Sequence, residues 1–306
     1  MTAPDTRILL TGATGQVGHE LRPRLATLGK LIPATRRVLD LAELDVIAAT
    51  LDAIAPNVIV NAAGFTAVDN AERDHELCHR VNGEATRLIA EWAAKHGALM
   101  VHFSSDYVFD GNHRKAYTET DATGPLNVYG ASKLAGEQAI AASGVAHLIF
   151  RTSWVYGAHG SNFARTMLRL AHQRTELGVV NDQCGTPTWA GRVADATAEV
   201  LAQIITPDTS ATKALGDRGG VYHMTAKGST SWYHFAEQVI AHDPKKSEQT
   251  LQALSPITTA EYPTPASRPK YSVLSSAKLH ATWGVTMPKW ETDLHNVMPS
   301  LEPTTR

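Results

Sequence analysis

Cysteine is scarce in this sequence, with only Cys78 and Cys184 among 306 residues. Two cysteines so far apart match neither a disulfide framework nor a zinc-binding spacing, and such usage is typical of a reducing compartment. The fourteen histidines show no H-E-x-x-H or comparable ligand spacing. We therefore expect a cytoplasmic protein and predict no metal site from these residue types.

An excess of charge of one sign is also absent. The chain has 28 Lys and Arg against 30 Asp and Glu, a formal net charge of −2, with no long basic run. Nucleic-acid-binding proteins carry basic patches, so no nucleic-acid partner is expected. No apolar run approaches the roughly 18 residues of a membrane-spanning helix, and the start MTAPDTRILLTG lacks the layout of a secretory signal. We expect no membrane association.

Short apolar runs alternate with helical patterns through the first half of the chain. This alternation is typical of a parallel sheet covered by helices on both faces, so we predict an α/β fold with a Rossmann-type doubly wound sheet. Ligands of such sheets bind outside the carboxyl ends of the strands, and here the expected strands run into the clusters TG, NAAG, SSD and RTSW. The expected strands are 7–12, 31–36, 57–63, 99–106 and 147–154, and the expected helices are 16–29, 45–56, 79–97, 131–144, 162–176 and 191–205.

A glycine loop follows the first expected strand, in LLTGATGQVG. Gly12 allows a sharp turn, Gly15 leaves room for a pyrophosphate, and Gly18 allows the helix to pack closely on the sheet. The N-terminus of the next helix offers free N–H groups to an anion. The alternative is a strand–turn–helix joint whose glycines serve packing alone.

We interpret residues 1–157 plus about 178–205 as an NAD(P)-binding domain, and about 158–177 and 206–306 as a smaller, interleaved α/β substrate domain.

Two arginines stand at the end of the second expected strand, where NAD-binding proteins have an acidic residue for the ribose. Arg36 could pair with a 2′-phosphate, which favours NADPH over NADH, although Arg36 and Arg37 could also be a solvated surface pair. Asp40 and Leu41 are close enough in sequence to reach the adenine.

A tyrosine and a lysine lie four residues apart in NVYGASKLAGE, and therefore on one face of a helix. A phenol has a pKa of about 10, and we expect the Lys133 ammonium to lower the pKa of Tyr129 so that it can donate a proton. Ser105 lies at the end of an expected strand, where its hydroxyl could hydrogen-bond a substrate carbonyl while Tyr129 protonates it. Taken singly, these patterns also fit an ordinary helix start and a turn.

The motifs TGATGQVG, NAAG, Ser104-Ser105, Y-G-A-S-K and RTSWVYG occur here in the order found in extended short-chain dehydrogenase/reductases, which the whole chain resembles. Within that superfamily, SSDYVFDG, PLNVYGASKLAGE, VVNDQCGTPT and YPTPASRPKYSVL are similar to the dTDP-4-dehydrorhamnose reductases. Those enzymes reduce the 4-keto group of a nucleotide sugar with NAD(P)H in dTDP-L-rhamnose synthesis.

The resemblance implies a set of site residues. Tyr129, Lys133 and Ser105 would be catalytic, with Tyr129 and Lys133 also on the nicotinamide ribose. The remaining cofactor residues would be Gly12, Gly15, Gln16, Val17, Ala62, Ala63, Gly64 and Thr66. The substrate residues would be Val68, Ser105, Asp106, Trp154, Asn162 and Arg268, the arginine facing the diphosphate.

Some relatives bind Mg²⁺ at a dimer interface, and Glu20 falls where one ligand could lie. Gly191 and Arg192 stand where further acids would be needed, so Mg²⁺ is not predicted here, and we expect a monomer or a homodimer.

Two alternatives to a reductase stay open. The first is a nucleotide-sugar epimerase or dehydratase, although Tyr107 stands where a dehydratase has a glutamate. The second is a non-catalytic subunit like the methionine adenosyltransferase beta subunit.

Overall fold

A computed structural model describes residues 6–303. Its centre is a parallel six-stranded sheet with the strand order β10-β5-β4-β3-β1-β2. This confirms the predicted doubly wound α/β class, because the order reverses at β1, with β2 on one side and β3 on the other. The strands are β1 (Arg7–Thr11), β2 (Lys30–Ala34), β3 (Val58–Asn61), β4 (Leu99–Ser105), β5 (His147–Thr152) and β10 (Gly220–His223).

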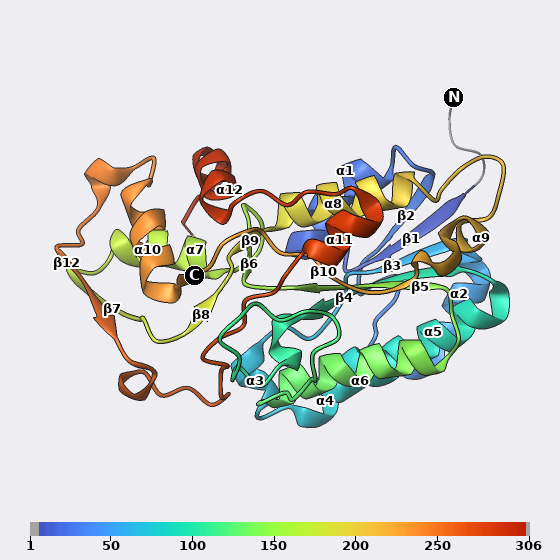
Figure 1. Cartoon of the computed structure of the whole chain (residues 1–306), viewed down its shortest axis with the longest axis horizontal. Coiled ribbons are helices and arrows are strands. Elements are labelled where there is room, and N and C mark those ends of the chain that lie inside the picture. The colour runs from blue at the N-terminus through green and yellow to red at the C-terminus, as the bar shows by residue number, and fades with distance from the viewer. Residues whose placement is uncertain (1–5, 304–306) are drawn as a thin grey trace.

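Helices cover both faces of this sheet, as Figure 1 shows. On one face lie α1 (Gln16–Leu25), α8 (Ala190–Ala202) and α11 (Ala277–Trp283). On the other lie α2 (Leu44–Ile54), α5 (Ala85–His96) and α6 (Val128–Ala142). Shorter segments between β3 and α5 are α3 (Val68–Ala71), α4 (His75–His79) and the π-helical turn η1 (Arg80–Glu84). A 3-10 turn, η2 (Asp106–Val108), follows β4.

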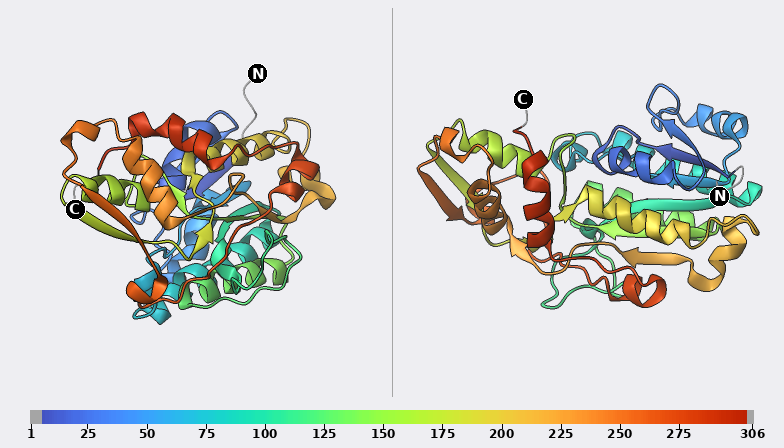
Figure 2. Two further views of the ribbon diagram at one scale, coloured as in Figure 1. Left: turned by 60° about the vertical axis from the view of Figure 1, so that its left-hand side comes forward. Right: turned by 90° about the horizontal axis from the view of Figure 1, so that it is seen from above.

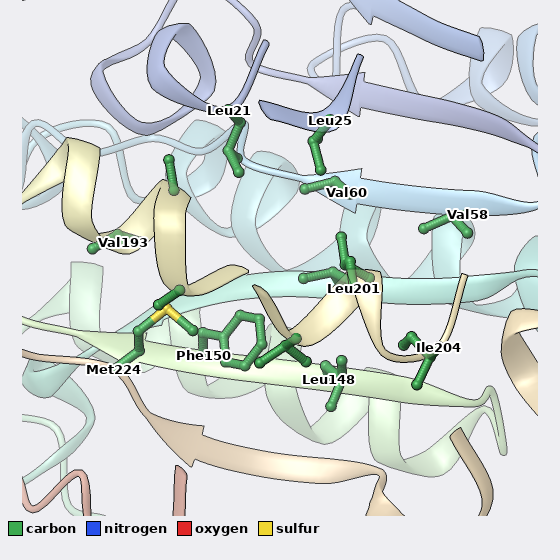
Figure 3. Close-up of a cluster of buried hydrophobic side chains, with 14 of the residues drawn as sticks. Leu21, Leu25, Val58, Val60, Leu148, Phe150, Val193, Leu201, Ile204 and Met224 are labelled. Atoms are coloured by element: carbon green, nitrogen blue, oxygen red, sulfur yellow. The ribbon is translucent and has the colours of Figure 1, made fainter. Parts of the chain in front are cut away.

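Apolar strands buried on both faces hold the two helical layers to the sheet. Figure 3 shows Leu21 and Leu25 of α1 and Leu201 of α8 in one apolar cluster with Val60 of β3 and Phe150 of β5; all five are fully buried. Each such side chain contributes roughly 1.5–3 kcal/mol by leaving water. This packing fixes the carboxyl ends of the strands as one rigid edge.

A smaller lobe faces that edge, and in the view from above it lies to one side of the sheet (Figure 2). Three short strand pairs contribute to it: β6 (Val155–Tyr156) with β9 (Thr188–Trp189), β7 (Glu176–Val180) with β12 (Ala253–Ile257), and β8 (Cys184–Gly185) with β11 (Thr230–Ser231). Its helices are α7 (Phe163–Ala171), α10 (Trp232–Ala241) and α12 (Trp290–Val297). The remaining elements are α9 (Ala211–Leu215), η3 (Gly216–Arg218), η4 (Lys246–Glu248), η5 (Thr259–Glu261) and η6 (Met298–Ser300).

The predicted domain boundaries need correction at two strands. β10 lies within the expected substrate domain, yet it hydrogen-bonds β5 and extends the main sheet. β7 lies partly within the expected cofactor domain, yet it pairs with β12 in the smaller lobe. Both strands are short, and the partner of a short strand is set by a distant segment rather than by its own pattern. In the region that the structure describes, no helix is both long enough and apolar enough to cross a membrane.

Candidate active site at the carboxyl edge of the sheet

The glycine loop turns directly out of β1 and into α1. Gly12 has φ +64°, and a Cβ there would lie 2.6 Å from the backbone of Ala62 in the loop after β3, so only glycine fits. Gly15 is the N-cap of α1, none of the described side chains caps this helix, and its first turn has no acidic residue. The N–H groups of Gln16 and Val17 lie in the first turn of α1, where no intrahelical acceptor is available, so together with the helix dipole they suit an anion such as a pyrophosphate.

The loop after β2 carries the residues expected near the adenosine. Arg36 and Arg37 are exposed. The Asp40 carboxylate accepts a hydrogen bond from the Ala42 N–H at 3.0 Å, and Leu41 is buried in the apolar core on the α2 side. Leu41 therefore anchors this loop to the apolar core, and its contact with adenine stays a prediction.

The loop after β3 is held by residues that the sequence analysis missed. Asn82, in the π-helical turn η1, accepts from the Phe65 N–H at 2.8 Å and donates to the Phe65 carbonyl at 3.0 Å. The same amide donates to Ser132 Oγ at 2.9 Å, which ties this loop to α6. A polar residue followed by glycine inside an otherwise regular helical pattern was the available signal, since π-turns are frequent at functional sites. Ala62, Ala63 and Gly64 lie partly buried within this loop and Thr66 is exposed.

Tyr129 and Lys133 lie in the first turns of α6, which Asn127 caps by accepting from the Gly130 N–H at 2.8 Å. Desolvation raises the pKa of Tyr129 to about 12, and the neighbouring Ser105 side chain acts in the opposite direction. Burial lowers the pKa of Lys133 to about 8, while the charge of Glu137 opposes that change. Tyr129 is therefore protonated at neutral pH, as a proton donor must be.

The structure corrects one expectation about this pair. Lys133 does not lower the pKa of Tyr129 in the protein alone; its Nζ lies 3.3 Å from Nε2 of His102 on β4. Residues four apart on a helix share a face, but that spacing does not determine which way a long, flexible side chain points. The effective partner is set by the neighbouring strand.

Ser105 and Asp106 form a buried hydroxyl–carboxylate cluster at the end of β4. Ser105 Oγ donates to Asp106 Oδ1 at 3.1 Å and accepts from the Tyr107 N–H at 3.1 Å. Ser153 donates to the other carboxylate oxygen at 3.0 Å. Asp106 is 2% exposed and holds the Ser105 hydroxyl through this hydrogen bond, and direct contact with a sugar stays a prediction.

The Asp106→Asn variant is expected to change how the free energy of unfolding depends on pH. Burial raises the pKa of Asp106 from 3.8 to about 6, although Ser272, Ser153 and Ser105 oppose the shift. Because the carboxyl pKa is higher in the folded state than in the unfolded state, protonated Asp106 stabilises the fold at pH values below the unfolded-state pKa. This contribution is lost as pH rises through the folded-state pKa. Relative to the variant, wild type should lose on the order of 3 kcal/mol across that interval. Urea unfolding of both proteins at several pH values measures this difference. If the free energy of unfolding changed with pH by the same amount in wild type and variant, the prediction would be contradicted.

The residues expected on the substrate side lie on several separate segments, and their contact with a substrate stays a prediction. Trp154 has φ +45°, a strained conformation for a large side chain, and stacks on Trp232 with ring centroids 3.5 Å apart. Val68 begins α3 and is partly buried. Arg268 pairs with Asp69, with Nη2 and Oδ2 2.7 Å apart, so a diphosphate would meet an arginine that already has a carboxylate partner.

Asn162 caps α7 by accepting from the Arg165 N–H at 3.1 Å. Its Nδ2 donates to Gln16 of the glycine loop helix at 2.9 Å and to the Gly157 carbonyl at 2.8 Å. Asn162 thus connects the smaller lobe to the glycine loop, and contact with substrate stays a prediction.

Glu20, the position considered for Mg²⁺, is engaged in an ion pair with Arg24, with Nη1 and Oε2 3.0 Å apart. Within residues 6–303, no group of three or more His, Cys, Asp or Glu side chains is placed to hold a metal ion.

Comparison with known proteins places this geometry in a family. The model of the RmlD substrate binding domain matches residues 6–302. The dTDP-4-dehydrorhamnose reductase of Burkholderia thailandensis is 46% identical, covering 93% of this chain and 95% of that protein. The enzyme of the same name from Escherichia coli K12 is 43% identical over 97% and 99% of the two chains.

Solved structures agree in fold and in sequence. A dTDP-4-dehydrorhamnose reductase from Clostridium acetobutylicum superposes with a TM-score of 0.86 at 35% identity, covering 96% of this chain and 98% of that one. The Bacillus anthracis enzyme, solved in complex with NADP, gives 0.85 at 32% identity over 96% and 99% of the chains. The chain therefore belongs to the dTDP-4-dehydrorhamnose reductase family.

Proposed function

We propose that this protein uses NADPH to reduce the 4-keto group of dTDP-4-dehydro-L-rhamnose, giving dTDP-L-rhamnose. The observation that carries the proposal is the position of Ser105 beside Tyr129 at the sheet edge that also holds the glycine loop. A hydroxyl pair so placed suits a carbonyl oxygen that must be polarised and then protonated. The family relatives named above carry this activity in their names.

The residues present fit a nicotinamide dinucleotide. The glycine cradle, in which a Cβ at Gly12 would strike Ala62, and the uncapped start of α1 would hold the pyrophosphate. Ala62, Ala63, Gly64 and Thr66 would border the nicotinamide ribose, with Tyr129 and Lys133 opposite. When bound, the reduced nicotinamide supplies the hydride for the keto carbon.

The chain's own residues handle the carbonyl oxygen. Ser105 would turn its single hydroxyl proton from Asp106 Oδ1 to that oxygen, and this hydrogen bond would orient the ketone. Tyr129 gives its proton to the oxygen as negative charge develops there. Because Lys133 does not lower the pKa of Tyr129 in the protein alone, we expect its positive charge to stabilise the phenolate only in the complex with cofactor. Trp154 and Arg268 would bind the sugar and the diphosphate. Whether the protein acts as a monomer or a homodimer stays a prediction.

The decisive experiment follows NADPH absorbance with purified protein and dTDP-4-dehydrorhamnose. We expect one NADPH consumed per sugar reduced, and slower turnover with other 4-keto sugar nucleotides. A product formed without net NADPH consumption would instead indicate an epimerase. No turnover, together with co-purification of a synthetase, would indicate a regulatory subunit.

The Arg36→Ala variant tests the choice between NADPH and NADH. If Arg36 binds the 2′-phosphate, its loss should raise the KM for NADPH about tenfold or more, since a charge-assisted hydrogen bond contributes about 1.5–3 kcal/mol. The KM for NADH should not change. Arg37→Ala, which removes the adjacent exposed guanidinium, is the matched control; equal effects of the two substitutions would rule out a specific phosphate contact at Arg36.

A further inference from the structure

A chain of four buried polar side chains crosses three strands beneath the site. Lys133 Nζ lies 3.3 Å from His102 Nε2, and His102 Nδ1 lies 3.2 Å from the Asn61 amide nitrogen. Asn61 Oδ1 accepts from Thr11 Oγ1 at 2.6 Å, and Thr11 Oγ1 accepts from the Ala63 N–H at 3.3 Å. The four residues that contribute these side chains, Lys133, His102, Asn61 and Thr11, are between 1% and 5% exposed.

The positions of these residues give the chain its significance. Thr11 ends β1 directly before Gly12, Asn61 ends β3, and His102 lies three residues before Ser105 on β4. This series of hydrogen-bonded side chains therefore links α6, which carries Tyr129 and Lys133, to the glycine loop at the point where the strand order reverses. Buried polar groups need partners, and these four satisfy one another.

We propose that His102 is a positioning residue that acts through Lys133, its neutral imidazole holding the ammonium in one place on the face of α6 that also carries Tyr129. This role rests on the proposed reductase function but is carried by contacts that exist without cofactor. His102 itself touches neither Ser105 nor Tyr129 through a hydrogen bond among those in residues 6–303.

Hydrogen-bond chemistry makes the charge of Lys133 and the proton position on His102 interdependent. An ammonium can only donate, so beside charged Lys133 the Nε2 of His102 must accept and the proton must sit on Nδ1. Nδ1–H then needs an acceptor, which Asn61 supplies by turning its amide so that Oδ1 faces the ring and Nδ2 faces Thr11. When Lys133 is neutral, the amide orientation of Asn61 that the structure shows satisfies both contacts of the imidazole ring: Asn61 Nδ2 donates to His102 Nδ1, and His102 Nε2–H faces the Lys133 amine.

The surroundings keep His102 neutral and Lys133 close to its point of titration. Desolvation, and then the charge of Lys133, lower the pKa of His102 well below 6.5. The other titratable groups facing Lys133 are Cys78 on α4 and Glu137, one helical turn away, which is paired with Arg151 on β5. Neither replaces His102 as an acceptor for Nζ among the described hydrogen bonds.

Two isosteric variants separate positioning from packing. In His102→Gln the amide falls near the place of Nε2 and can still accept from Lys133, whereas in His102→Asn it falls near Nδ1 and keeps only the Asn61 contact. For His102→Asn we expect the alkaline limb of the kcat profile to move to lower pH by about one unit, with kcat at neutral pH down about tenfold and KM nearly unchanged. His102→Gln should stay close to wild type. Equal pH profiles in both variants would overturn the proposal.

A spectroscopic measurement on the cofactor-free protein does not depend on activity or on the stability of the His102 variants. In ¹⁵N-histidine-labelled wild type, the His102 ring should carry its proton on Nδ1 while Lys133 is charged and on Nε2 above the pH at which Lys133 titrates. Lys133→Met should abolish this switch. A ring with one fixed proton position in both proteins would refute the coupling, whereas a switch in a protein without reductase activity would refute only the proposed function.

Discussion

Replacing Tyr129 with phenylalanine is expected to lower kcat about a thousandfold, because a positioned proton donor contributes roughly 10²–10⁴ in rate. The ring, the α6 backbone and the Asn127 cap stay in place, so NADPH should bind with nearly unchanged affinity. Ser105 would still polarise the carbonyl, but the oxygen would have to draw its proton from water. Single-turnover kinetics with titrated NADPH separate the two effects.

Tyr222→Phe is the matched control for this variant. Tyr222 lies on β10, and its hydroxyl donates to the Arg218 carbonyl at 2.6 Å, away from the sheet edge where Ser105 and Tyr129 meet. Its loss should lower the free energy of unfolding by about 1 kcal/mol and leave kcat unchanged. Turnover of Tyr129→Phe within a few-fold of wild type would remove the phenol from the mechanism.

Breaking the Glu137–Arg151 pair is expected to have the largest effect on stability. Both side chains are 5% exposed, and the carboxylate receives Arg151 Nη2 at 2.6 Å and Nε at 2.9 Å. Glu137→Leu would leave a buried guanidinium without its partner, which typically costs about 3–5 kcal/mol. Urea denaturation at neutral pH would measure the loss.

The double variant Glu137→Leu/Arg151→Met tests whether the loss comes from the stranded charge. An apolar pair of similar size should restore most of the free energy of unfolding, because a buried ion pair adds little over well-packed apolar side chains. If the double variant is no more stable than Glu137→Leu, lost packing between α6 and β5 is the cause instead. Lys133 should also lose protons more readily in Glu137→Leu, since the charge of Glu137 raises the pKa of Lys133.

Local patterns were sufficient to predict the sheet and the residues at its edge. Apolar strands that run into polar clusters, and glycines that allow a tight turn before a helix, are consequences of short-range chemistry. They predict Gly12, Ser105, Tyr129 and Lys133 at one edge of the sheet. They did not assign β7 and β10 correctly, because a strand of four or five residues takes its partner from a distant segment.

The sequence by itself therefore determined the fold class and the chemical groups available to the site. Only the tertiary structure decided how those groups are paired: Lys133 with His102, Arg268 with Asp69, and Asn162 with Gln16. A single polar residue in the apolar run LMVHF hinted at His102 but did not reveal its partner. The physical reason is that hydrogen bonds and ion pairs depend on distances between residues far apart in the chain, and those distances exist only once the apolar core has fixed the strands and helices.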